Sequence, residues 1–388
     1  MLLSICVLTY NRRDYLEKLF QSIKDSKVLE SNQVELVIVN NGSTDNTKQF
    51  LSYLAADSSV KILNREINLR GSNAYREVID AATGQWIIYP GDDDLFDSKT
   101  LNGLPSILQT MSKEITLVPF SARTIDEKGK LTPINYKPSK EINRSLLFAD
   151  LFEKSIYWFP ATCFRRSLVT ESESPKTITL FDWWIWLQGI SQGRPEPQES
   201  TLIAYRVHSG QEQRTFLSDV WQLDQMSVFM ELIENKVVHE WISKATDQEL
   251  TQFIQQLMNL QIEEASSIGS KFIYLQLGRK ISYTRPLFSE MIIDLLIKKG
   301  LDVRFVAQWL GRDLSIHYLK SALMNLGLDS ISLENIANQK DLESLLYDKL
   351  LSQRRSEIEK EITPTERKVL GFYRKIRNMN LIRWIIKK

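Results

Sequence analysis

Three consecutive carboxylates, Asp92, Asp93 and Asp94, follow the apolar run Trp86–Tyr89. Such a run is typical of a strand buried on both faces, so the three charges stand directly at its end. One interpretation is a solvated turn, because aspartate is favoured in turns. The other interpretation is that the three carboxylates bind a positively charged partner. Hard cations such as Mg²⁺ and Mn²⁺ take one or two protein carboxylates together with phosphate oxygens, which makes this turn a candidate metal site.

The elements that position this turn follow from the hydrophobic pattern. Apolar runs alternate with segments of helical periodicity five times, which predicts a mostly parallel sheet with helices on both faces. The runs cover residues 2–8, 36–39, 60–63, 86–89 and 115–120. Polar clusters follow the first four: Thr9-Tyr10-Asn11, Asn40–Ser43, Asn68–Gly71 and Asp92–Asp94. Because ligands bind at the carboxyl ends of strands in open sheets, we expect these clusters to meet at one edge. Asn11, and either Thr44 or Asp45, are expected to cap the following helices.

The chain has 388 residues, which suggests more than one domain. Residues 121–215 are irregular and rich in aromatic side chains, whereas long amphipathic helices with few prolines follow. We therefore predict a first domain at 1–215, a helical region at 216–362 and a basic tail at 363–388. The helical region would dock an acceptor, form a dimer or contact partner enzymes.

Three blocks of the sequence resemble the family 2 glycosyltransferases of bacterial surface-polysaccharide synthesis, which have the GT-A fold. SICVLTYNRRDYLEKLFQSI resembles their first strand and helix, and ELVIVNNGSTDNT their second strand and polar turn. NLRGSNAYREVIDAATGQWIIYPGDDD resembles the stretch that leads into their DxD metal motif. The resemblance is close over residues 1–100 and looser over 100–215.

The resemblance implies a nucleotide-diphosphate sugar donor and a Mn²⁺ or Mg²⁺ ion. Asp94 would be the direct metal ligand, with Asp92 and His208 as further ligands. Asn41 stands where the family usually has an aspartate that touches the base, and uridine is the expected base. Arg206 and Arg214, in YRVHSGQEQR, would pair with phosphate oxygens. The remaining donor-binding residues would be Thr9, Tyr10, Asn11, Arg70, Asp92, Asp93 and His208.

Sugar transfer needs a base that deprotonates the acceptor hydroxyl. Asp182, in LFDWWIWL, resembles the second acid of the family's Glu-Asp pair, although Phe181 replaces the first. One carboxylate suffices for single displacement, which inverts the anomeric configuration. The alternative role of Asp182 is a helix N-cap. The neighbouring tryptophans are expected in the core, with a sugar platform as the alternative.

Composition excludes several classes of protein. Lys and Arg number 49 against 48 Asp and Glu, a net charge of +1 that gives no sign of nucleic-acid binding. The two cysteines, Cys6 and Cys163, have no zinc spacing and favour a reduced cytoplasmic compartment. No apolar run approaches the roughly 18 residues of a membrane span. No basic segment precedes the first apolar residues, so we expect no signal peptide.

The tail TERKVLGFYRKIRNMNLIRWIIKK carries eight basic residues and one acid. Its apolar residues share one helical face, a profile typical of a helix lying on an anionic membrane surface. The alternative is a basic helix that packs on its own domain. The resemblance favours the membrane, because such enzymes often extend lipid-linked sugars on the cytoplasmic face.

The sequence therefore predicts an inverting, metal-dependent glycosyltransferase acting on a glycan or lipid-linked glycan. One alternative is a nucleotide-sugar-binding or scaffold protein without catalysis. The other is a nucleotidyltransferase, which should carry a glycine-rich loop after the first strand, where TYNRRD has none. An oligomer is compatible with either.

Overall fold

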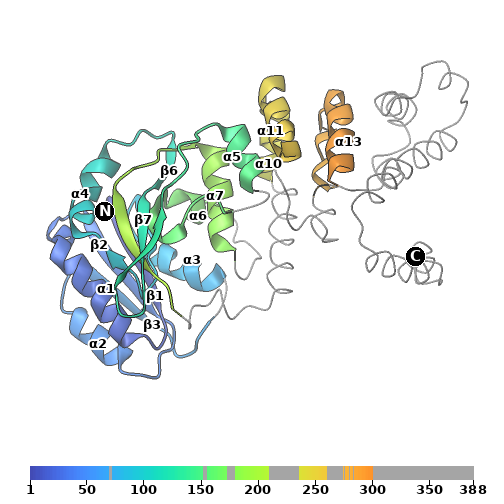
Figure 1. Cartoon of the computed structure of the whole chain (residues 1–388). Helices are drawn as coiled ribbons and strands as arrows, with labels where there is room; N and C mark the ends of the chain where they lie inside the picture. The colour runs from blue at the N-terminus through green and yellow to red at the C-terminus, as the bar shows by residue number, and fades with distance from the viewer. Residues whose placement is uncertain are drawn as a thin grey trace, which may run out of the picture. The chain divides into compact units, whose positions relative to one another are not determined.

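The computed structural model describes residues 1–69, 72–151, 155–172, 180–208, 236–259 and most of 274–299. All of them belong to one compact unit, Met1–Gly300. Its centre is a seven-stranded sheet in the order β10-β6-β9-β4-β1-β2-β3 (Figure 1). These strands are β1 (Leu3–Thr9), β2 (Val34–Asn40), β3 (Val60–Asn64), β4 (Trp86–Ile88), β6 (Ile115–Pro119), β9 (Thr162–Arg165) and β10 (Arg194–Pro195).

The first four strands of this sheet are parallel, as the alternating pattern predicts. β1 pairs with β2 on one side and β4 on the other, and β2 pairs with β3. β6, the fifth predicted strand, runs in the same direction, but β9, which the local pattern does not predict, enters antiparallel between β4 and β6. The sheet is therefore mixed beyond β4.

Helices cover both faces of the large sheet. Figure 1 shows α1 (Arg13–Ser26), α2 (Thr47–Leu54) and α4 (Ser98–Gln109) on one side, and α3 (Ser72–Ala81), α6 (Ser167–Thr170) and α7 (Phe181–Gln192) on the other. The core lies where α1 and α4 pack on the sheet. Leu16, Leu19 and Ile23 of α1 are buried at the helical spacing that the sequence shows, against Ile5 and Ile38 of the strands.

A second, four-stranded sheet follows the order β5-β11-β7-β8. It consists of β5 (Leu95–Phe96), β7 (Ser121–Ile125), β8 (Leu131–Tyr136) and β11 (Thr201–Arg206). β7 and β8 form a hairpin, and β11 runs parallel to β7 and antiparallel to β5. Because β5 directly follows the acidic turn, this sheet returns residues 201–208 to that turn. The sequence analysis left this region as irregular.

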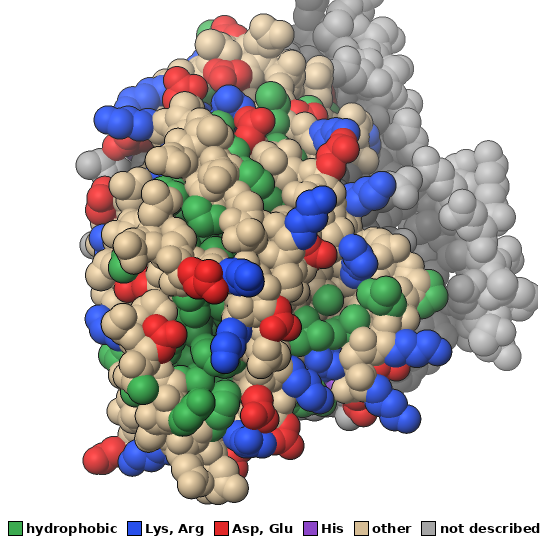
Figure 2. All heavy atoms as spheres, turned by 90° about the vertical axis from the view of Figure 1, so that its left-hand side faces the viewer, with side chains coloured by type: hydrophobic (Ala, Val, Ile, Leu, Met, Phe, Trp, Pro, Cys, Tyr) green, Lys and Arg blue, Asp and Glu red, His purple; other side chains and the backbone are tan. Residues whose placement is uncertain are grey.

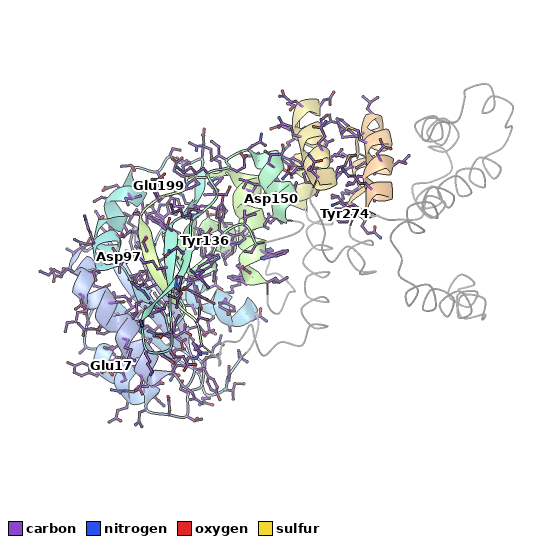
Figure 3. The ribbon with its side chains drawn as sticks, in the orientation of Figure 1. Glu17, Asp97, Tyr136, Asp150, Glu199 and Tyr274 are labelled. Atoms are coloured by element: carbon purple, nitrogen blue, oxygen red, sulfur yellow. The ribbon has the colours of Figure 1, made fainter. Side chains whose placement is uncertain are left out.

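Further helices follow, among them α10 (Lys236–Lys244), α11 (Asp247–Asn259) and α13 (Ser289–Lys298). α11 packs on α5 (Arg144–Leu151), where Gln256 donates to Asp150 at 3.1 Å (Asp150 is labelled in Figure 3). Asn143 donates to Gln252 at 3.1 Å, and the rings of Phe148 and Trp241 stack with centroids 4.7 Å apart. The first helices of the helical region thus pack directly on the mixed α/β part.

Candidate active site

The acidic turn follows β4 at the carboxyl edge of the large sheet, where the sequence predicts it. The turn is buried rather than solvated: Asp92 is 8% exposed, Asp93 7% and Asp94 0%. Thr9, the last residue of β1, donates from Oγ1 to Asp92 Oδ2 at 2.8 Å. The first and fourth polar clusters therefore meet, as parallel pairing of β1 and β4 requires.

Arg12 lies against two of the three carboxylates. One terminal guanidinium nitrogen is 3.2 Å from Asp92 Oδ1 and 2.7 Å from Asp93 Oδ2. Burial raises the pKa of Asp92 to about 6; Arg12 opposes this shift, and Asp93 adds to it. The Arg12 guanidinium thus compensates part of the negative charge of the acidic turn. The sequence analysis did not assign Arg12 to the site.

Asp94 lies behind the other two carboxylates. Its Oδ2 accepts the Gly91 backbone N–H at 2.8 Å, and its Oδ1 accepts that of Arg206 at 3.0 Å. Burial, and then repulsion from Asp93, raise the pKa of Asp94. Asp94 therefore ties the acidic turn to β11, and both of its oxygens bond to the backbone.

Arg206 holds the turn from the opposite side and is 1% exposed. Its Nε donates to the Asp93 carbonyl at 2.7 Å, and a terminal nitrogen donates to the carbonyls of Asp126 and Glu127 at 2.9 and 3.2 Å. These bonds fix the backbone of the acidic turn to the β7–β8 hairpin. The guanidinium predicted to bind phosphate is directed to main-chain carbonyls.

His208, two residues beyond β11, reaches the acidic turn, as the resemblance implies. Its Nε2 lies 2.6 Å from Asp93 Oδ2, and its ring stacks on Tyr15 with centroids 5.5 Å apart. The Arg206 guanidinium lies 5.1 Å from the centroid of the same tyrosine ring. Tyr15 is not among the site residues that the sequence predicts; its place in the first helical turn after the first strand is the signal that could have found it.

Asn41 is buried at the end of β2, and its amide contacts protein on every side. Nδ2 donates to Asn68 Oδ1 at 2.8 Å and to the Leu69 carbonyl at 2.7 Å. Oδ1 accepts from Leu69 N at 2.9 Å and from Arg65 at 3.1 Å. An amide has two donor hydrogens and two acceptor lone pairs, so this network uses its full capacity. Asn41 thereby holds residues 65–69 against the sheet edge.

Asn11 joins two loops at the same edge. It adopts a left-handed conformation with φ 53°, and its Oδ1 accepts from Thr44 N at 2.7 Å. Ser43 Oγ accepts from Asn11 N at 3.0 Å. The expected cap Asn11 is wrong, because Arg12 occupies the cap position of α1. Asn46 occupies that of α2, but Asp45 Oδ1 accepts the N–H of Thr47, the first residue of α2, at 3.0 Å. Tyr10 is 40% exposed beside this junction.

Asp182 is the second residue of α7, and Leu180 is the N-cap, so the alternative role of Asp182 as N-cap is wrong. Burial raises the pKa of Asp182 to about 6. Ser155 donates to its Oδ2 at 3.3 Å and accepts from Trp186 Nε1 at 3.2 Å. The tryptophans of α7 are 0–4% exposed, which places them in the core.

A chain of stacked rings links α7 to the acidic turn. Tyr75 of α3 stacks on Phe181 with centroids 5.6 Å apart and contacts Tyr89, next to β4, at 5.4 Å. Phe159 stacks on Tyr89 at 5.5 Å. These contacts place the N-terminus of α7 at the sheet edge that carries the aspartates.

Comparison with known proteins agrees with this arrangement. The family described as Glycosyl transferase family 2 matches residues 4–172. The chain contains a family 2 glycosyltransferase domain. Within it lie β1, the acidic turn and Asn41, whereas Asp182 and His208 lie beyond the matched segment.

Two bacterial proteins are examples of relatives of this chain. An uncharacterized glycosyltransferase of Rickettsia felis is 25% identical over 216 residues, which cover 54% of this chain. The chain spans 35% of the length of that relative. The putative teichuronic acid biosynthesis glycosyltransferase TuaG of Bacillus subtilis is 24% identical over 195 residues, which cover 50% of this chain and 73% of TuaG.

A solved structure shares the fold. The crystal structure of S. aureus TarS 1–349 in complex with UDP-GlcNAc aligns with a TM-score of 0.51 and 15% identity. The alignment covers 78% of this chain and 89% of that one. The glycosyltransferase domain therefore has the GT-A fold, as the sequence predicts. In the part of the chain that the structure describes, no helix is both long enough and apolar enough to cross a membrane.

The donors at the acidic turn suit a hard divalent cation that takes its other ligands from phosphate. Within the described ranges, no group of three or more His, Cys, Asp or Glu side chains forms a complete metal cage. Asp93 Oδ2 contacts both Arg12 and His208 Nε2, and Asp92 Oδ1 contacts the same guanidinium nitrogen of Arg12, so these donors are linked to one another through Arg12 and Asp93. A cation bridged to a diphosphate needs no more than these from the protein.

Some of the predicted residues and regions lie outside the described residues. They are Arg70, Arg214, most of 216–362 and all of 363–388. Their roles stay predictions. The described cysteines are buried in the sheet, where burial raises the pKa of both thiols.

Proposed function

We propose that this protein is an inverting glycosyltransferase that moves a sugar from a nucleotide-diphosphate donor, expected to be a UDP-sugar, to a hydroxyl of a glycan or lipid-linked glycan. This proposal depends on two buried contacts, Thr9 with Asp92 and His208 with Asp93, which bring the ends of β1, β4 and β11 together. Nucleotides bind at this edge of open α/β sheets. The complex of TarS with UDP-GlcNAc supports a UDP-sugar donor, and the similarity to TuaG, a putative teichuronic acid biosynthesis glycosyltransferase, supports surface-polysaccharide synthesis.

On the donor side, Asp92, Asp93 and His208 would hold a Mn²⁺ or Mg²⁺ ion and the diphosphate. The ion supplies neutralisation of the negative charge on the leaving diphosphate. Asp94 and Arg206 are positioning residues, because their hydrogen bonds go to the backbone of the acidic turn and its neighbours. Residues 65–69, held by Asn41, would form the side of the nucleotide pocket.

On the acceptor side, Asp182 is the general base. Its carboxylate takes the proton of the acceptor hydroxyl, whose oxygen bonds to the anomeric carbon on the face opposite the diphosphate. The bond from that carbon to the diphosphate oxygen breaks, and the configuration inverts. Ser155 orients the carboxylate through its 3.3 Å hydrogen bond.

The Asp182→Asn variant tests this assignment. Loss of a general base lowers the turnover rate by about 10²–10⁴-fold, whereas donor affinity should stay unchanged. In the wild type, kcat/KM should fall below about pH 6, the pKa to which burial raises Asp182, because the base must be ionised. Release of UDP from a panel of UDP-sugars and acceptor glycans measures turnover, and calorimetry measures UDP affinity.

The exposed Asp25→Asn variant is the matched control and should behave as the wild type. Transfer by Asp182→Asn at the wild-type rate would contradict the base assignment. Donor binding without any transfer by the wild type would favour the non-catalytic alternative. Release of pyrophosphate in place of a nucleoside diphosphate would identify a nucleotidyltransferase; its glycine-rich loop is absent from Thr9–Arg12.

We further propose the division into 1–215, 216–362 and 363–388. Contacts of α11 with α5 support a role of the helical region in shaping the acceptor side. The basic tail would hold the enzyme, as a peripheral protein, at the cytoplasmic face of the membrane.

A further inference from the structure

Arg12 occupies the position at the acidic turn where a cation is needed. A single guanidinium nitrogen contacts both Asp92 Oδ1, at 3.2 Å, and Asp93 Oδ2, at 2.7 Å. The side chain of Arg12 is 27% exposed, against 10% for Asp92 and 9% for Asp93. The arginine therefore covers the two carboxylates from the solvent side.

The pairing has an electrostatic cause. Two buried carboxylates on adjacent residues repel each other, and a nearby positive charge stabilises their ionised forms. Burial lowers the pKa of Arg12, but attraction to Asp92 and then Asp93 outweighs burial, so the pKa is raised. Arginine is always charged at physiological pH. The acidic turn thus has a permanent positive charge beside it, the guanidinium of Arg12.

This cation shares an oxygen with the predicted metal donors. Asp93 Oδ2 contacts both Arg12 and His208 Nε2, the latter at 2.6 Å. A divalent ion bound by Asp93 and His208 would lie within a few ångströms of the guanidinium. Like charges so close, in a partly buried site, repel strongly. The arginine and the ion cannot both hold Asp93 in this way.

Arg12 is placed so that it can exchange partners. It lies in the loop between β1 and α1, at the sheet edge where a diphosphate would bind. A guanidinium that leaves the carboxylates can pair with phosphate oxygens, for which its planar fork is well suited. Arg12 can therefore pair with the carboxylates before the donor binds and with the diphosphate afterwards.

We propose that Arg12 is a resident counter-cation that competes with the divalent ion for Asp92 and Asp93 until the donor diphosphate draws it away. This inference rests on the proposed function, and it makes metal binding depend on the donor. The protein without nucleotide should bind Mn²⁺ weakly, and UDP should increase its Mn²⁺ affinity strongly.

The experiment measures free Mn²⁺ by electron paramagnetic resonance in titrations of the full chain, with and without UDP. Arg12→Gln should bind Mn²⁺ at least tenfold more tightly than the wild type in the absence of UDP. The increase in Mn²⁺ affinity on adding UDP should shrink in this variant by a similar factor. Arg12→Lys, which keeps the charge, should stay within about threefold of the wild type, because it retains the repulsion.

Arg13→Gln is the matched control. Arg13 is the neighbouring arginine, and it pairs with Asp14 and Glu17 of α1 rather than with the acidic turn. Its Mn²⁺ affinity should equal that of the wild type. Thermal unfolding gives a second readout: Arg12→Gln should melt at a lower temperature than the wild type, and Mn²⁺ alone should restore its melting temperature.

Two outcomes overturn the proposal. If folded Arg12→Gln binds Mn²⁺ without UDP no more tightly than the wild type, while both bind Mn²⁺ with UDP, only the role of Arg12 fails. If none of these proteins binds Mn²⁺ even with UDP, the metal-dependent function fails together with it.

Discussion

At the residue scale, the site is built from polar side chains that are buried and contact other protein groups. The predicted donor residues divide into two groups by their contacts. Asp93 contacts His208 and shares Arg12 with Asp92, whereas Asp94, Arg206 and Asn41 bond to backbone and hold loops. Residue type alone could not separate these groups. An aspartate that binds a metal and an aspartate that holds the backbone through hydrogen bonds are the same residue in the sequence.

Asn41→Ala tests the second group. The variant removes a bond to Asn68, two to the backbone of Leu69 and one to Arg65. A lost buried bond costs about 1–3 kcal/mol, so we expect UDP affinity to fall about tenfold as residues 65–69 loosen. Calorimetry with UDP measures this. The exposed Asn46→Ala should bind as the wild type, and unchanged affinity in Asn41→Ala would contradict the role.

At the element scale, strands are fixed at both ends by buried polar groups. At the end of the sheet away from the site, Glu35 of β2 accepts from Ser4 Oγ of β1 at 2.5 Å and from Thr83 N at 2.6 Å. It also accepts from Gly84 N at 3.2 Å, just before β4. One carboxylate thus joins β1, β2 and the entry to β4, the three strands that position the acidic turn.

Glu35→Gln should destabilise the domain by about 1–3 kcal/mol at pH 7, the range of hydrogen bonds to charged groups. Burial acts to raise the pKa of Glu35, but hydrogen bonds from Ser4, Thr83 and Gly84 outweigh it and lower the pKa. A lowered folded-state pKa gives stability that is present above the unfolded value, near pH 4.3, and is lost as pH falls through the folded value. The difference between wild type and variant should therefore shrink in acid.

Urea unfolding at a series of pH values checks this expectation, with the exposed Glu30→Gln as control. A difference that is constant from pH 7 to pH 3 would show that the charge of Glu35 contributes nothing.

At the scale of the whole molecule, charge is balanced rather than concentrated. The net charge is +1, and Figure 2 shows basic and acidic side chains interspersed on the face it displays. That face therefore has no concentration of positive charge that would attract an anionic surface over a long distance. The dense basic charge of the chain is in residues 365–388.

Replacement of Arg374, Lys375 and Arg377 by Gln should weaken binding to anionic vesicles. Each basic residue near such a surface contributes about 1 kcal/mol, so a loss of about 100-fold in vesicle affinity is expected. Cosedimentation with phosphatidylserine vesicles measures it, and 0.5 M salt should weaken the wild type similarly because of screening. Exposed Lys24, Lys48 and Lys128 replaced together by Gln serve as control. Equal binding of both triple variants would favour a tail that packs on its own domain.

The sequence by itself determined the first half of the fold and the place of the acidic turn. Apolar runs and helical spacing are local patterns, and β1–β4 with α1–α4 are formed and ordered as those patterns predict. The parallel order of these strands brings Thr9 to Asp92, 83 residues away.

Only the tertiary structure decided which side chains complete the site. The antiparallel entry of β9 and the return of β11 depend on pairing between distant segments, which leaves no local periodicity. His208 meets Asp93 across 115 residues, and Arg12 meets it across 81. Contacts of this kind arise when strand ends and loops pack at one edge, so local periodicity does not predict them; the resemblance implied His208 at the site, whereas Arg12 was found only in the structure.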